Sequence, residues 1–205
     1  MKIECSIFNQ DDKNYVHIND TEVYFENLNR TIEFIKNDTE TEFLNFAYVA
    51  LCASTLEASL NHIIFTFYIN NFGPIEYKKY SESLINMSFS NKLHSVPNIV
   101  SKAAFYIDSD CFTIKKLEEL ITLRNRILHK KPTLQEVEYN IHNLELGMEV
   151  TFKNNNHIQS ITKNQCLNFN KAMLNFKNEF MIPFLLGELK ENKLIKRNHN
   201  TSEIR

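Results

Sequence analysis

Three polar residues near the end of one predicted helix, Arg124, Asn125 and His129, carry the side chains that metal-independent RNA cleavage needs. In that reaction the 2′-hydroxyl loses a proton, the leaving oxygen gains one, and cations stabilise the phosphate in the transition state. A histidine can transfer these protons, and an arginine can hold the phosphate through its paired N–H donors. These residues are therefore the first candidates for a functional site.

Arg124 occupies an unusual position for a charged residue. The apolar residues of its helix, spaced at about 100° per residue, form one stripe made of Leu117, Leu120, Ile121 and Leu128. Arg124 falls near the centre of that stripe, where a guanidinium is costly unless an anion pairs with it. We therefore expect Arg124 either to pair with an internal acid, for which Glu57 is the main candidate, or to face a groove shared with a ligand or a second subunit.

Asn125 and His129 stand four residues apart and so share one helix face, where the amide can orient the imidazole. His129 is roughly 140° from Arg124 around an ideal helix, so the two converge only through the long arginine side chain, a distorted helix end or a second copy of the chain. The helix dipole favours the protonated imidazole, whereas Lys130 and Lys131 oppose it. The same lysines could attract phosphates.

The segment Leu123-Arg124-Asn125-Arg126-Ile127-Leu128-His129 resembles the Arg-polar-x(3)-His form of the Arg-x(4–6)-His signature of HEPN domains. This resemblance implies a compact bundle of helices and a two-fold dimer that brings two motifs into one cleft. In active members it also implies metal-independent endoribonuclease activity in toxin, abortive-infection or antiviral systems.

A second segment, Thr55 to His62, looks similar to the other core helix of that family, which often carries a Glu facing the motif; here that residue is Glu57. One position departs from the family. A subgroup has a Tyr two residues beyond the His, and this chain has Lys131, so the resemblance does not imply nucleotidylation at that position.

Each candidate also has a purely structural interpretation. Arg124 could form a structural salt bridge, His129 could cap the C-terminus of its helix, and Asn125 could be an ordinary surface residue. For Glu57, a supporting role in neutralising Arg124 is preferred over direct chemistry. His62 is predicted to be a satisfied, partly buried histidine.

The composition favours a helical protein. The chain has 205 residues, of which 43% are hydrophobic and 23% charged, and it contains 3 Gly and 4 Pro, which suits long elements better than a turn-rich β fold. We predict one all-α domain over residues 1–190 and a disordered polar tail over 191–205. The net charge of −2 provides no overall basic field, so RNA would need a local patch, for which Arg126, Lys130 and Lys131 are the candidates.

The four cysteines lie far apart, without a CxxC pair or zinc-finger spacing, and are expected to be reduced thiols: Cys5, Cys52, Cys111 and Cys166. Neither a metal nor a cofactor is expected. We find no signal-peptide pattern at the N-terminus and no stretch as long as a charge-free membrane span, so the expected location is the cytoplasm, without a membrane partner.

The pattern of apolar residues predicts helices at regular intervals. Their expected ranges are 21–37, about 40–71 with a stop at Phe72-Gly73-Pro74, 77–87, 91–104 with a break at Pro97, 113–131, and 163–189 with a kink at Pro183. Two small hairpins are expected as decorations, one at the N-terminus over 1–18 and one around 144–161.

We interpret the chain as a homodimeric HEPN-like endoribonuclease with an RNA substrate, acting as a toxin or phage-defence effector beside an antitoxin or defence-system partner. Two alternatives stay open. One is a non-catalytic HEPN-like module that binds a nucleotide, RNA or a protein, and the other is a purely structural helical bundle.

Overall fold

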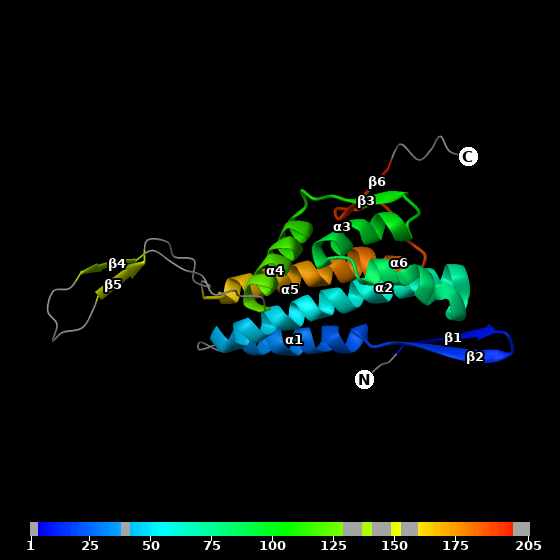
Figure 1. Ribbon diagram of the computed structural model, residues 1–205, viewed down its shortest axis with the longest axis horizontal. Coiled ribbons are helices and arrows are strands. Elements are labelled where there is room, and N and C mark those ends of the chain that lie inside the picture. Colours follow the sequence, from blue (N-terminus) through cyan, green and yellow to red (C-terminus); the bar gives the residue numbers. More distant parts are fainter. Residues whose placement is uncertain (1–3, 38–41, 129–136, 141–148, 153–159, 199–205) are drawn as a thin grey trace.

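The chain folds mainly into helices, which confirms the predicted class, and three small two-stranded sheets decorate them (Figure 1). The computed structural model describes residues 4–37, 42–128, 137–140, 149–152 and 160–198, and all counts of elements below refer to these ranges.

The N-terminal hairpin is confirmed. β1 (Glu4–Gln10) pairs antiparallel with β2 (Lys13–Asn19), and Ile7 lies opposite Val16. The connecting residues Asp11 and Asp12 both have positive φ, at 51° and 59°, as a tight primed turn requires. The two strands are therefore joined by a two-residue turn.

Two long helices follow the hairpin. α1 (Thr21–Asn37) has the predicted bounds, and α2 (Glu42–Ile85) runs through the middle of the molecule. The predicted stop at Gly73 is a bend: Gly73 has non-helical angles (φ 77°, ψ 169°), but the helix resumes after it. It runs to Ile85 and so covers most of the separately predicted helix over 77–87. Gly is favoured there because of its positive φ. An added Cβ would lie 2.6 Å from Oε1 of Gln10, which is the movable end of a flexible side chain.

Contrary to the expectation from the sequence, Phe43–Ile85 is long and apolar enough to match a membrane span by length and composition. Core helices meet the same criterion, and half of the residues in its most apolar window are buried inside the fold.

The middle of the chain forms α3 (Phe89–Val100), β3 (Phe105–Ile107) and α4 (Phe112–Leu128). Ser88 caps α3 by accepting a hydrogen bond from the Asn91 amide at 3.4 Å. Pro97 does not break this helix, which continues for one more turn, and residues 101–104 are not part of it.

The predicted helix over 163–189 is divided. α5 (Lys163–Phe176) passes into a π-helical turn, η1 (Lys177–Met181), and then into the short α6 (Ile182–Leu185). Pro183 has no N–H to donate and its ring would collide with the preceding turn of a regular helix, so the wider π turn lies just before it. The helix ends at Leu185 rather than at Leu189.

The prediction that residues 191–205 form a disordered tail is wrong for part of that range. β6 (Ile195–Arg197) pairs with β3, and Leu194 and Ile195 are fully buried. The stretch is mostly polar, but the burial of these two apolar side chains and the pairing with β3 hold it against the core. The other predicted hairpin also differs, because the partner of β5 (Glu149–Phe152) is β4 (Val137–Asn140), which precedes the predicted range 144–161.

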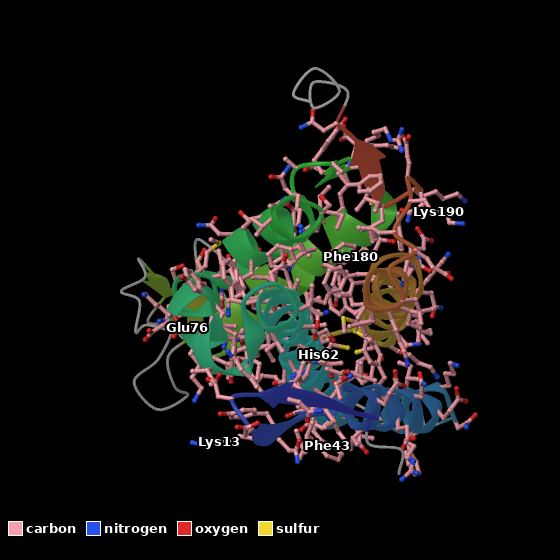
Figure 2. The ribbon with its side chains drawn as sticks, turned by 90° about the vertical axis from the view of Figure 1, so that its right-hand side faces the viewer. Lys13, Phe43, His62, Glu76, Phe180 and Lys190 are labelled. Carbon is pink, nitrogen blue, oxygen red and sulfur yellow. The ribbon has the colours of Figure 1, made fainter. Side chains whose placement is uncertain are left out.

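One hydrophobic core joins the helices. α2 packs against α1, α3, α4 and α5, and the C-terminal elements close the core from the side (Figure 2). Phe180 lies inside, whereas Lys13, Glu76 and Lys190 point outward (Figure 2). The packing places the C-terminal turn of α4 beside the middle of α2, where Glu57 lies.

Candidate functional site

Arg124 lies in the last described turns of α4 with its side chain 25% exposed. On the preceding turns of the predicted apolar stripe, Leu117, Leu120 and Ile121 are buried, whereas Leu128 at its end is 55% exposed. The predicted apolar stripe therefore ends before Leu128, and the arginine stands at the border between core and solvent.

Glu57 of α2 is the acid that pairs with Arg124, as predicted from the sequence. Its Oε2 lies 3.9 Å from Nη2 of Arg124. This distance is at the long end for an ion pair, and both groups are partly exposed, so the pair orients the guanidinium more than it stabilises the fold.

Lys92 of α3 is a second cation at the same carboxylate, and the sequence analysis did not identify it. Its Nζ lies 3.7 Å from Oε1 of Glu57 and donates to Oδ1 of Asn61 at 3.0 Å. The Lys92 side chain is only 3% exposed. The signal was present in the sequence, because Lys92 follows Phe89 by three residues and precedes Val96 by four, and so shares the buried face of α3.

Asn125 is exposed, and its Oδ1 accepts a hydrogen bond from Nη1 of Arg124 at 3.0 Å. Arg124 is thus held from two sides, by Asn125 on its own helix and by Glu57 across the interface with α2. Arg126 is exposed in the same turn. His129, Lys130 and Lys131 lie outside the described residues, so the predicted contact between Asn125 and the imidazole is untested.

The charges of this cluster do not cancel. Two cations, Lys92 and Arg124, share one carboxylate, Glu57, which leaves one positive charge among the three groups. The ammonium of Lys92 is enclosed, so the partly exposed guanidinium is the group of the three that an anion from solvent can reach. An arginine in this situation can bind a phosphate oxygen while it keeps its contact with the protein.

Comparisons with protein-family models, curated proteins and solved structures found no match to this chain. The resemblance to HEPN domains therefore depends on the segment from Leu123 to His129 and on the helix that carries Glu57. Among the described residues, no three His, Cys, Asp or Glu side chains are grouped closely enough to hold a metal ion.

The Glu57 carboxylate should matter for stability because Lys92 is buried beside it. We expect Glu57→Gln to lower the free energy of unfolding by about 1–3 kcal/mol, since the ammonium would remain buried without its anion. Adding Lys92→Met should recover most of this loss. Urea denaturation of the single and double variants tests the prediction. The matched control is Glu33→Gln, whose ion pair with Lys36 is exposed and should change stability by less than about 0.5 kcal/mol. A double variant as unstable as Glu57→Gln alone would contradict the pairing.

The buried cysteines are poor nucleophile candidates. Cys52 and Cys166 are fully buried free thiols. Burial raises the pKa of both, that of Cys166 to about 12, so neither forms the reactive thiolate near neutral pH.

His62 is partly buried, as predicted, and its ring stacks on that of His17 from the hairpin, with centroids 5.2 Å apart. Burial, together with the charge that His17 would carry, lowers the pKa of His62 to about 4, and Asp20 opposes this shift. Burial also lowers the pKa of His17. His62 is five residues after Glu57, hence about 140° around α2, so the histidine pair faces a different side of the helix from Arg124.

Acid should therefore destabilise the protein through His62. The unfolded chain takes up a proton near pH 6.5, whereas folded His62 resists protonation until about pH 4, so the free energy of unfolding falls as the pH decreases through this window. The slope contributed by His62 is at most about 1.4 kcal/mol per pH unit. We expect urea denaturation to show a larger loss of stability between neutral and mildly acidic pH for the wild type than for His62→Gln. Equal losses would contradict the assignment.

Proposed function

We propose that this chain is a HEPN-type endoribonuclease that cleaves RNA without a required metal ion, with Arg124 as the phosphate-binding residue and His129 as the proton-transfer residue. The observation that carries the proposal is the partly exposed guanidinium of Arg124, which Glu57 and Asn125 hold in place beside the second cation, Lys92. The motif from Leu123 to His129 adds the imidazole in the same stretch of chain.

In the proposed reaction, an imidazole accepts the proton of the ribose 2′-hydroxyl, and the oxygen attacks the adjacent phosphorus. The bond from phosphorus to the 5′-oxygen breaks, and that oxygen receives a proton from a protonated imidazole. The products are a 2′,3′-cyclic phosphate and a 5′-hydroxyl. Arg124 stabilises the negative charge that gathers on the phosphate oxygens in the transition state.

A homodimer suits this chemistry, since one imidazole from each subunit could serve as base and acid. Asn125 is proposed to support the geometry at the helix end, and Arg126, Lys130 and Lys131 to bind neighbouring RNA phosphates. The proposed setting is the cytoplasm, where the enzyme would act as a toxin or phage-defence effector controlled by an antitoxin or a defence-system partner.

A second candidate is a non-catalytic HEPN-like module that binds a nucleotide, RNA or a protein. The favouring observation is that Glu57 already neutralises part of the charge of Arg124, as in a binding site that accepts an anion without transforming it.

Inducible expression in a bacterial host separates the two candidates. An active endoribonuclease should stop growth on induction, and its His129→Ala variant should not, at equal protein levels. The matched control is His94→Ala, which removes a histidine paired with Glu118 on the surface and should remain toxic. Normal growth with the wild type, or equal toxicity of His129→Ala, would count against the nuclease proposal.

A further inference from the structure

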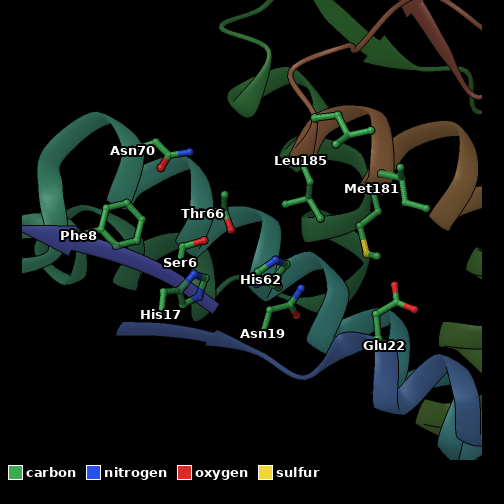
Figure 3. Close-up of a pocket in the computed structure, with 12 residues that line it drawn as sticks. Ser6, Phe8, His17, Asn19, Glu22, His62, Thr66, Asn70, Met181 and Leu185 are labelled. Carbon is green, nitrogen blue, oxygen red and sulfur yellow. The ribbon is translucent and has the colours of Figure 1, made fainter. Parts of the chain in front are cut away.

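A pocket of about 380 Å³ opens between the N-terminal hairpin, α2 and the C-terminal helix, away from Arg124 (Figure 3). The hairpin, α1 and α2 supply its polar residues. η1, α6 and the residue that follows supply an apolar wall of Met181, Ile182, Leu185 and Leu186. Figure 3 shows Thr66 and His62 on one side of the hollow, across from Leu185 and Met181. The volume lies in the range of small-molecule sites.

The hydroxyl of Thr66 is buried and has no hydrogen-bond partner in the part of the chain that the structure describes. Other hydroxyls of α2 behave differently, since Thr55 donates to the carbonyl of Leu51 and Ser59 donates to that of Thr55, both at 2.8 Å. A buried hydroxyl without a partner costs free energy, and Thr66 is one of the residues that line the pocket.

The apolar wall of the pocket lies where the C-terminal helix departs from regular α-helical geometry. Met181 ends the π-helical turn η1, and Ile182 begins α6. Single π turns inside helices are uncommon and often occur at functional sites. The turn changes the direction of the apolar side chains that follow it, and these form the wall opposite Thr66.

The charge of the pocket excludes a strongly charged ligand. Among the described residues that line it there is no Lys or Arg, and its carboxylate, Glu22, is already paired with Lys177 at 2.6 Å. The lowered pKa values of His17 and His62 keep both imidazoles neutral near pH 7, so each offers one donor and one acceptor. The stacked rings of His17 and His62 also give the pocket an aromatic element.

We propose that this pocket binds a small, uncharged heteroaromatic molecule of one or two rings. The apolar wall contacts the ring face, and Thr66, His62 and Asn70 bond with the ring nitrogens and exocyclic polar atoms. This inference does not depend on the proposed nuclease activity, because the pocket and Arg124 lie on different sides of α2.

Titration of the full chain with adenine and uracil, followed by NMR of the histidine side chains, tests the inference. We expect saturable shifts of the His62 and His17 ring signals for at least one of the two probes, with a Kd between about 0.1 and 5 mM, as for other ligands of this size. Benzoate, an aromatic anion of similar size, should bind at least about tenfold more weakly, because the described lining residues include no Lys or Arg to pair with its carboxylate.

Two variants locate the binding. Thr66→Val should weaken binding about five- to tenfold, since it removes one hydrogen bond at nearly constant volume. Asn70→Ala, at an exposed position that does not threaten folding, should also weaken it. The matched control is Thr55→Val on the same helix, which should bind the probe like the wild type. Absence of binding by both probes, equal binding of benzoate, or wild-type affinity in the Thr66→Val and Asn70→Ala variants would overturn the inference.

Discussion

His129→Ala is expected to lower the rate of RNA cleavage by about 10²- to 10⁴-fold, the usual contribution of a positioned proton donor or acceptor. The methyl group can neither accept the 2′-hydroxyl proton nor protonate the leaving oxygen. The rate should be measured under single-turnover conditions with one defined RNA, so that product release does not mask the chemical step.

The control for this substitution is His94→Ala, which should stay within about twofold of the wild type because the pair that it removes is partly exposed. A His129→Ala protein that cleaves as fast as the wild type would remove His129 from the mechanism.

Arg124→Ala should reduce cleavage by about 10²- to 10³-fold, because it removes the guanidinium proposed to stabilise the phosphate in the transition state. Arg124→Lys should retain more activity than Arg124→Ala but less than the wild type, since lysine keeps the charge and loses the paired planar donors. The ordering of the three rates is the diagnostic result.

The structure indicates that the loss in Arg124→Ala should not come from unfolding. Glu57 keeps Lys92 as a partner at 3.7 Å, so no carboxylate is left without a cation. Thermal unfolding should therefore change little, with a loss below about 1 kcal/mol. Wild-type cleavage by Arg124→Ala would contradict the proposed role, as would a loss of activity that simply follows a loss of folded protein.

The sequence was sufficient to predict features that depend on local patterns. α1 has its expected bounds, because its apolar residues recur at helical spacing between clear ends. The pairing of Glu57 with Arg124 could be predicted because burying a charge costs free energy, so a charge within an apolar stripe needs a counter-charge. The bend at Gly73 was visible as a Gly-Pro pair, although the sequence did not reveal that a helix continues beyond it.

The features that were missed depend on contacts between distant parts of the chain. β3 and β6 are short and almost 90 residues apart, so neither has a recognisable pattern alone, and their pairing appears only in the folded chain. Lys92 reaches Asn61, and His17 stacks on His62, through packing between separate elements. Side chains that meet in this way share no spacing in the sequence, which is why the role of Lys92 and the whole pocket needed the structure.

The most direct test of the proposed reaction uses purified wild-type protein, a short RNA and the same RNA with a 2′-deoxy residue at the cleavage position, both in excess EDTA. The account predicts that the RNA is cut to a 2′,3′-cyclic phosphate and a 5′-hydroxyl, and that the 2′-deoxy substrate stays intact. An absence of cleavage in EDTA that divalent metal restores, or cleavage of the 2′-deoxy substrate at the same bond, would contradict it.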